Sequence, residues 1–411
     1  MKHQKNKHAL AFIFITVLLD MLALGLIIPI LPGLIVGLAG GDKVRGALVV
    51  GLFGTVFALM QFVFSPVLGS LSDRFGRRPV ILLSNLGMGL DYLVMALAPT
   101  LGWLFVGRVL SGLTASSVGT AFAYIADSTT PKTRAAGFGV LGAAFSLGFV
   151  VGPGLGGWLG GMGPRLPFWA AAGLSLVNFL YGFLVLPESL RASRRSAFQW
   201  KKANPVGSLQ LLRSHAELSG LAWIYFLNSL AHGVFTSVFV LYVGYRYHWG
   251  PPLVGFCLML VGLATGTVQG GLIRPVVRRF GEKRALLAGL GFGLLGFLVF
   301  GWAPTGGLFN WGIPLSALWG LAGSPLQSLM SQRVGRSIQG QLQGANGSLR
   351  AIAELIAPGL FTSIYAFFIT PGRALQLPGS AFFLAAFLLV LAGIGAWNVK
   401  TPGPGKTKEA R

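Results

Sequence analysis

Long apolar stretches separated by short polar segments run through the chain. A helix that crosses a membrane needs about 20 mostly apolar residues. Lipid offers the backbone no hydrogen-bond partners, so each such stretch must be helical. The pattern therefore predicts an all-α integral membrane fold with twelve transmembrane helices, at 9–31, 47–69, 79–99, 102–126, 136–160, 167–187, 219–243, 252–273, 284–303, 310–331, 345–370 and 375–398.

The first stretch resembles a signal peptide because Lys2, Lys5 and Lys7 precede it. It is longer than a signal-peptide core, carries Asp20 at its middle and shows no small-residue cleavage site. We therefore expect it to stay in place as the first transmembrane helix.

Composition agrees with a membrane protein. Of the 411 residues, 54% are hydrophobic and 10% are charged, whereas soluble domains carry about 25% charged residues. This argues against a water-soluble enzyme, and the high hydrophobicity argues against intrinsic disorder.

The basic residues predict the orientation. The formal net charge is +22, and most of the lysines and arginines fall in alternate loops. Five basic residues fall in the other loops: Lys43, Arg45, Arg165, Arg246 and Arg373. Arg108 and Arg350 lie inside the stretches themselves. By the positive-inside rule both termini face the cytoplasm of a plasma membrane, which we expect to be a bacterial inner membrane. Charge spread over alternate loops also argues against nucleic acid as a partner.

The chain divides into two similar parts. The long polar stretch at 188–218 reads as a cytoplasmic linker between six-helix halves at 1–187 and 219–398, followed by a cytoplasmic tail at 399–411. Arg74-Phe75-Gly76 recurs as Arg279-Phe280-Gly281 in the loop of the other half. Such internal repeats are typical of transporters that bind substrate near the membrane midplane between two halves.

The loop "GSLSDRFGRRPVILL" is the most informative polar segment. Its glycines, Gly69 and Gly76, permit a tight turn and close helix approach. Asp73 and Arg77 are four residues apart and share a helix face. Charge alone would also suit an ordinary solvated loop, but the whole string is more specific than that.

At this point the chain resembles the major facilitator superfamily, and within it the tetracycline-efflux-like drug:proton antiporters. The first helix reads "LDMLALGLIIPILPG" with Asp20, and the fourth reads "GRVLSGLTASSVGTAFAYIAD" with Arg108 and Asp127. The loop signature is matched by Gly69, Asp73, Arg74, Gly76, Arg77 and Arg78, and the antiporter signature of the fifth helix by Gly148, Gly152, Pro153, Gly156 and Gly157. The resemblance implies the major facilitator fold, proton-coupled export, and a conformational latch built from the loop signature and Asp127.

Two positions depart from that family pattern. The histidine of helix 8 and the aspartate of helix 9 that serve coupling in tetracycline exporters correspond to Thr265 and Gly293. The resemblance therefore leaves tetracycline itself open as a substrate.

Ionisable groups inside membrane helices are costly and mark functional sites by default. Five lie within the predicted stretches, away from their ends: Asp20, Asp91, Arg108, Arg350 and Glu354. We predict that Asp20, Asp91, Arg108 and Glu354 serve proton coupling, with an aspartate as the partner of Arg108. The alternatives are a neutral hydrogen-bonded Asp20, a packing role for Asp91, and an Arg350–Glu354 pair, four residues apart, that merely neutralises itself.

Several uncharged polar side chains are candidates for lining a substrate cavity: Gln61, Asn228, His232, Gln269 and Asn346. Asn228 and His232 share a helix face by their spacing. For each of them the alternative is a hydrogen-bonded packing role.

We expect a monomeric secondary transporter that exports small amphipathic compounds in exchange for protons. It would need no cofactor beyond the proton gradient, because the chain has no phosphate-binding "GxxxxGK[ST]" loop. Its partners would be small molecules, protons and the bilayer. The nearest alternative is a transporter of an endogenous metabolite, and a lesser one is a non-transporting membrane sensor. An enzyme is not expected, since no metal cluster, nucleophile motif or paired catalytic acids stand out.

Overall fold

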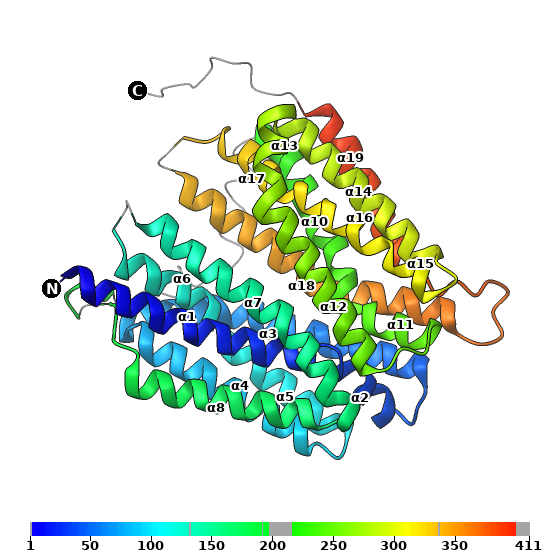
Figure 1. The fold of residues 1–411 in the computed structure, drawn as a ribbon, viewed down its shortest axis with the longest axis horizontal. Coiled ribbons are helices and arrows are strands. Elements are labelled where there is room, and N and C mark those ends of the chain that lie inside the picture. Colours follow the sequence, from blue (N-terminus) through cyan, green and yellow to red (C-terminus); the bar gives the residue numbers. More distant parts are fainter. Residues whose placement is uncertain (1, 131–132, 191, 197–215, 336–337, 400–411) are drawn as a thin grey trace. The chain divides into compact units, whose positions relative to one another are not determined.

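The structure is a computed structural model that describes residues 2–130, 133–190, 192–196, 216–335 and 338–399. All regular elements in these ranges are helices (Figure 1). Eleven described segments are long and apolar enough to cross a membrane. They are Leu10–Leu38, Lys43–Phe75, Arg77–Leu97, Leu101–Ser128, Ala136–Met162, Leu166–Val185, Leu218–Ser237, Pro251–Phe280, Glu282–Trp302, Gln339–Ile369 and Ser380–Asn398. The all-α membrane fold expected from the sequence is confirmed.

The predicted stretch 310–331 has no counterpart among these eleven segments. It divides into α16 (Gly312–Leu318), the 3₁₀ turn η5 (Trp319–Leu321) and α17 (Gly323–Ser331). Glycine is a weak helix former and proline has no N–H for the helical ladder. Gly320, Gly323 and Pro325 therefore account for the division.

The described chain folds into two compact units. Unit 1 takes in Met1–Asn204 and His248–Gly262, and unit 2 takes in Pro205–Tyr247 and Leu263–Arg411. The sequence-based halves, linker and tail stay a prediction. Much of the expected linker (197–215) and most of the tail (400–411) lie outside the described residues.

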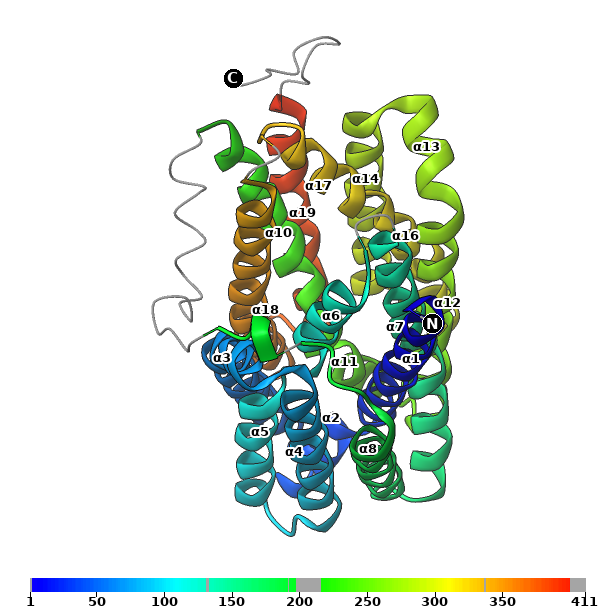
Figure 2. The same cartoon turned by 90° about the vertical axis from the view of Figure 1, so that its left-hand side faces the viewer.

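The described residues of unit 1 form eight helices, a short 3₁₀ turn and the first part of α12. Its elements are α1 (Lys2–Ile27), α2 (Leu31–Leu38), α3 (Lys43–Phe75), α4 (Arg77–Leu97), α5 (Leu101–Thr114), α6 (Ser117–Ser128), α7 (Arg134–Met162), α8 (Leu166–Val185), η1 (Ala192–Arg194) and the start of α12 (Pro251–Thr267). Helix α1 packs along α7 and α8, and α4 packs against α8 and α5 (Figures 1 and 2). This packing brings the polar residues of α1, α4, α5 and α8 into one interior.

Unit 2 contains the remaining elements of the described residues. They are α10 (Ala216–Ser237), α11 (Phe239–Arg246), the end of α12, the π-helical turn η4 (Val268–Leu272), α13 (Ile273–Phe280), α14 (Glu282–Trp302), α15 (Gly306–Asn310), α16, η5, α17, α18 (Gln339–Ile369) and α19 (Ser380–Asn398). Helix α10 packs against α18 and α19, and α14 packs against α19 (Figure 2). Large aromatic side chains fill the interior, among them Phe297, Phe300, Phe309, Tyr365 and Phe382.

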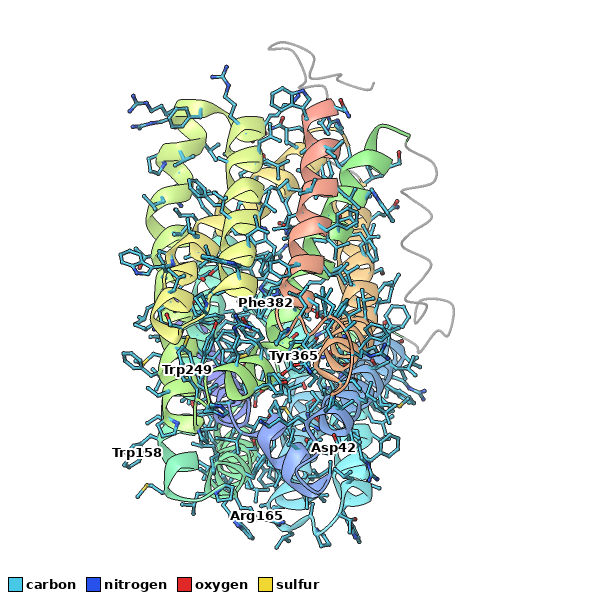
Figure 3. The ribbon with its side chains drawn as sticks, turned by 90° about the vertical axis from the view of Figure 1, so that its right-hand side faces the viewer. Asp42, Trp158, Arg165, Trp249, Tyr365 and Phe382 are labelled. Carbon is cyan, nitrogen blue, oxygen red and sulfur yellow. The ribbon has the colours of Figure 1, made fainter. Side chains whose placement is uncertain are left out.

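Polar residues at helix ends satisfy the free backbone groups there. Asp42 caps α3, since its Oδ1 accepts hydrogen bonds from the amides of Val44 and Arg45 at 2.9 and 3.1 Å. Arg165, just before α8, donates to the carbonyl oxygens of Ala96 and Ala98 at 2.8 and 2.7 Å, at the end of α4. Both residues lie at the ends of their helices (Figure 3).

Candidate functional site

A buried ion pair joins α4 to α5 in unit 1. Nη2 of Arg108 lies 2.6 Å from Oδ2 of Asp91, and their side chains are 9% and 0% exposed. The guanidinium also approaches Sδ of Met95 at 3.5 Å and lies 5.5 Å from the centre of the Phe57 ring. The partner expected for Arg108 is therefore Asp91, and the pair is enclosed on several sides by apolar atoms.

Gly107 makes room for this pair. A Cβ at that position would lie 2.5 Å from Oδ1 of Asp91, which is too close for a real side chain. The glycine before Arg108 thus lets α4 and α5 approach closely enough to form a direct contact.

Asp20 is the second buried acid of unit 1. Its Oδ1 accepts a hydrogen bond from Nδ2 of Asn178 on α8 at 2.8 Å, and the same amide donates to the Thr16 carbonyl at 2.9 Å. Asp20 takes part in none of the ion pairs between described residues. The buried Tyr92 is near enough to interact electrostatically with Asp20, Asp91 and Arg108, so the three charged groups occupy one interior region.

The loop between α3 and α4 forms the expected charge cluster. Nη1 of Arg77 lies 2.5 Å from Oδ1 of Asp73, and Nε lies 2.9 Å from Oδ2 of Asp127 at the end of α6. Nη1 also donates to Oγ of Ser72 at 2.7 Å. One buried guanidinium thus connects the loop to α6 within unit 1.

Glu188, which sequence reasoning assigned only to the linker, belongs to this cluster. Its Oε1 accepts the backbone N–H of Arg77 at 2.9 Å and its Oε2 accepts that of Arg78 at 3.2 Å. A carboxylate at the first amides of a helix is stabilised by the helix dipole. The "PES" string after the sixth stretch was the available signal, but nothing in its spacing pointed to α4, more than a hundred residues earlier.

The other loop-signature residues divide into different roles. Gly76 has a φ of 111°, the left-handed region that favours glycine, and it makes the turn between α3 and α4. Gly69 lies inside α3, with no described atom within 4 Å of where a Cβ would stand, so the close approach expected there is absent. Arg78 donates to the Phe183 carbonyl, and the exposed Arg74 lies over the ring of Phe75.

The glycines of the antiporter signature line one continuous helix, α7, through Pro153. A Cβ at Gly152 would lie 2.8 Å from the Cα of Gly25, so α1 and α7 touch backbone to backbone. Gly148 and Gly156 likewise approach Met21 and Leu26 of α1. On another face, a Cβ at Gly157 would lie 2.9 Å from the Cα of Gly255 in α12. Small residues permit this close packing between membrane helices.

Three of the predicted cavity residues lie at Trp319 or at its neighbour Gly320 in unit 2. Nε1 of Trp319 donates to Oδ1 of Asn228 at 2.8 Å, and the His232 ring centre lies 5.6 Å from the Trp319 ring. Gln269 lies against the neighbouring Gly320, whose Cβ position is 3.6 Å from the Gln269 Cγ. Trp319 itself was not singled out from the sequence, because tryptophan is equally at home in a core or at a membrane surface.

Gly293, one of the two departures from the tetracycline-exporter pattern, faces the same tryptophan. A Cβ there would lie 2.7 Å from Cγ of Trp319 and 2.8 Å from Cδ1 of Leu389. The indole therefore occupies the space into which an acidic side chain at this position would extend.

Arg350 and Glu354 form the expected pair on α18, with Nε 2.7 Å from Oε1. Their side chains are 65% and 47% exposed, in contrast to the buried pair of unit 1. Asn346, one turn earlier, is buried, and its amide atoms have no hydrogen-bond partner within the described part of the chain. Gln61 is partly buried on α3 of unit 1, whereas Trp319 belongs to unit 2.

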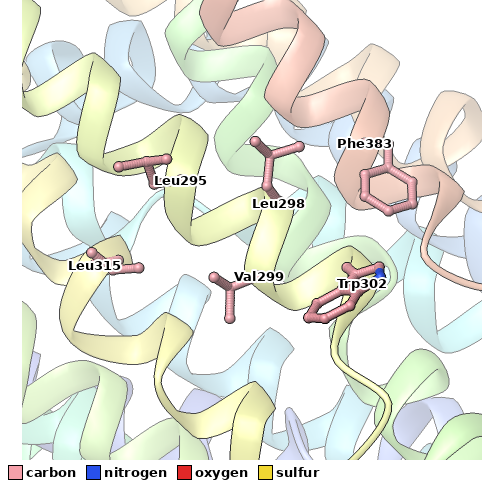
Figure 4. A pocket seen from close by; sticks show the side chains of 6 residues that line it. All are labelled: Leu295, Leu298, Val299, Trp302, Leu315 and Phe383. Atoms are coloured by element: carbon pink, nitrogen blue, oxygen red, sulfur yellow. The ribbon is translucent and has the colours of Figure 1, made fainter.

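An apolar hollow of about 470 Å³ lies elsewhere in unit 2 (Figure 4). Its lining residues are Leu295, Leu298, Val299, Trp302, Leu315 and Phe383. Its lining offers no charged side chain, so it supplies none of the chemistry of the ion pairs described above. The described residues also contain no group of three or more metal-ligating side chains.

Membrane-length helices with a buried ion pair in their interior are typical of multi-pass membrane transporters. More particularly, the chain belongs to the Major Facilitator Superfamily, whose family model matches residues 13–358. It is 36% identical over 398 residues to the class C tetracycline resistance protein of Escherichia coli, covering 97% of this chain and 99% of that protein. It is also 36% identical to the class G tetracycline resistance protein of Vibrio anguillarum, covering 84% and 88% of the two chains.

A solved structure supports the same assignment. The crystal structure of the human organic anion transporter MFSD10 (TETRAN) matches with a TM-score of 0.71 and 26% identity, covering 95% of this chain and 99% of that one. The chain is therefore a transporter of small molecules that shares both fold and sequence with these proteins.

Proposed function

We propose that this transporter exports small amphipathic compounds from the cytoplasm in exchange for protons. Its relatives named for tetracycline resistance support the export of drug-like compounds. The proposed transport uses alternating access, in a monomer whose termini both lie in the cytoplasm. The alternate placement of the basic residues supports this orientation.

The observation that carries proton coupling is the burial of Asp20, which takes part in none of the ion pairs between described residues. A carboxylate inside the membrane is expensive to charge, and taking up a proton removes that cost. Asn178 holds the carboxyl group between α1 and α8 whether or not it carries the proton. Each proton that returns inward contributes about 2.3 kcal/mol per 100 mV of membrane potential.

The Asp91–Arg108 pair supplies a means of linking protonation to conformation. Arginine stays charged under all physiological conditions. Protonation of Asp91 would release the guanidinium from its 2.6 Å contact, and a new partner would require helices α4 and α5 to move. The Arg77 cluster would act as the latch that holds one conformation, through its contacts with Asp73 and Asp127.

The test is Asp20→Asn in everted membrane vesicles energised by respiration. Substrate-induced proton release is followed with a pH-sensitive acridine dye, using tetracycline, ethidium and fluorescein as substrates. We expect release to fall to background for every substrate that the wild type transports. Folding should persist, because the substituted amide still accepts from Asn178.

Asp42→Asn is the matched control. It removes the same charge from an exposed site, and asparagine is an equally good helix cap. Wild-type proton release from Asp20→Asn would remove Asp20 from the mechanism. An absence of proton release across the whole panel in the wild type would refute drug export.

A second candidate is transport of an endogenous metabolite. Thr265 and Gly293, the two departures from the tetracycline-exporter pattern, favour it. The space beside Gly293 is filled by Trp319, so unit 2 presents an aromatic surface there. Growth in a pump-deficient host distinguishes the two candidates: protection against none of a varied drug panel favours the metabolite.

A further inference from the structure

Two irregular turns meet in unit 2. The π-helical turn η4 (Val268–Leu272) interrupts the helix that carries Gln269, and the 3₁₀ turn η5 (Trp319–Leu321) interrupts the next stretch but one. The two turns contact each other, with Gln269 lying against Gly320. π-Helical turns are rare and frequently mark functional sites. Irregular backbone at membrane depth is tolerated where it is enclosed by protein or lines a cavity.

The aromatic part of this region is held in a defined orientation. Asn228 fixes the indole of Trp319 by a 2.8 Å hydrogen bond, and the absence of a side chain at Gly293 lets the ring lie against α14. The His232 ring stands 5.6 Å away at an angle of 39°. The His232 side chain is exposed, so a flat apolar molecule has access to this edge of the pair of rings.

Arg350 lies within electrostatic range of the His232 ring. Helix α18 meets α10 at Ala357 and Gly233, and Gly233 is the neighbour of His232. Glu354 and Arg350 lie one and two turns before Ala357, and both charges are close enough to act on the His232 ring. The charged pair and the two rings therefore belong to one group, which we call the Trp319 cluster: Asn228, His232, Trp319, Arg350 and Glu354.

The ion pair with Glu354 occupies only one of the three nitrogen atoms of the Arg350 guanidinium. Glu354 contacts only Nε of Arg350, and no described residue donates to or accepts from its two Nη atoms. Those two atoms form the planar fork that binds a carboxylate or a similar planar anion through two parallel hydrogen bonds. The side chain is 65% exposed, so the fork is open to a ligand. In unit 1 the corresponding guanidinium of Arg108 is enclosed.

We propose that the Trp319 cluster is a binding site for amphipathic organic anions. The carboxylate or enolate of the ligand lies on the Nη fork of Arg350, and its ring system lies against Trp319 and His232. Glu354 orients the guanidinium through Nε, and its own negative charge weakens the binding of an anion. This inference rests on the proposed function of small-molecule transport and specifies its substrate class.

The test measures binding to the purified full-length protein in detergent, without a proton gradient. Fluorescein and rhodamine 6G serve as probes because they share a xanthene ring system, while one is an anion and the other a cation. Fluorescence polarisation gives the dissociation constant of each. We expect the wild type to bind fluorescein more tightly than rhodamine 6G.

Substitutions of Arg350 and Glu354 are expected to change the fluorescein affinity in opposite directions. Arg350→Gln should weaken fluorescein binding by about ten- to a hundredfold, the usual effect of losing hydrogen bonds to a charged group. Glu354→Gln should tighten it, since the repelling charge is removed while the amide oxygen still accepts from Nε. A purely structural ion pair would instead lose binding in both variants. Arg373→Gln is the control, because it removes an exposed arginine that contacts Phe367 outside the cluster.

Unchanged fluorescein affinity in Arg350→Gln would overturn the proposal. The proposal would also be overturned if the wild type bound rhodamine 6G more tightly than fluorescein and Glu354→Gln lost rhodamine 6G binding. That result would identify a cation site instead. These outcomes are separable from failure of the proposed function. A protein that exports ethidium in vesicles but does not bind fluorescein in detergent has proton-coupled export and lacks only the anion site.

Discussion

Replacing Arg108 with methionine should strongly destabilise unit 1. The substitution leaves the Asp91 side chain, which is 0% exposed, without the guanidinium 2.6 Å away. Breaking a buried ion pair by removing one partner costs about 3–5 kcal/mol, because the remaining charge stays buried and uncompensated. Methionine keeps most of the apolar volume beside Phe57 and Met95, so lost packing contributes little.

A double-mutant cycle isolates the electrostatic part of this loss. We expect Asp91→Leu combined with Arg108→Met to recover most of the thermal stability, since buried ion pairs can often be replaced by apolar residues of similar volume. The assay is the unfolding midpoint of the purified protein in detergent, followed by intrinsic fluorescence. Transport in everted vesicles is measured on the same four proteins: the wild type, Asp91→Leu, Arg108→Met and the doubly substituted protein.

The two readouts separate packing from coupling. The doubly substituted protein should be stable but inactive, because it has no charge for a proton to neutralise. A wild-type unfolding midpoint in Arg108→Met would show that the pair contributes nothing to stability. Full transport by the doubly substituted protein would refute a role for the pair in coupling.

Three further perturbations test other contacts. Glu188→Gln should lower stability by about 0.3–2 kcal/mol, seen as a small drop in the unfolding midpoint, because the amides at the start of α4 lose a charged acceptor. Arg77→Ala should slow transport cycles in vesicles by removing both ion pairs of the loop, and unchanged turnover would show that the loop serves topology alone. Gly152→Leu should abolish the folded monomer peak in gel filtration because α1 leaves no space there, whereas Gly173→Leu, with open space beside it, should leave that peak unchanged.

Short-range patterns in the sequence were enough for the membrane fold. The length of each apolar stretch predicts a spanning helix whatever its neighbours are, because the bilayer imposes that requirement on every segment alone. The Arg350–Glu354 and Asp73–Arg77 pairs were likewise predictable, since residues four apart on a helix share a face. The division of 310–331 was not, because whether glycine and proline interrupt a membrane helix depends on the helices packed around them.

Contacts between distant segments were decided by the tertiary structure. The sequence offered Arg108 two aspartates, and only the packing of α4 on α5 selects Asp91. Glu188 looked like an ordinary linker residue until the fold placed it at the first amides of α4. Trp319 carried no signal of its own until Asn228 and Gly293 were seen to hold it.

The physical reason is the same in each case. Helical periodicity and hydrophobic length act over a few residues and are written in local sequence. The partner of a buried charge depends on which side chains of neighbouring helices come within hydrogen-bond distance, about 3 Å, and that is a property of the packed bundle. The sequence by itself therefore named the candidate residues for proton and substrate binding, and the tertiary structure decided which of them lie together.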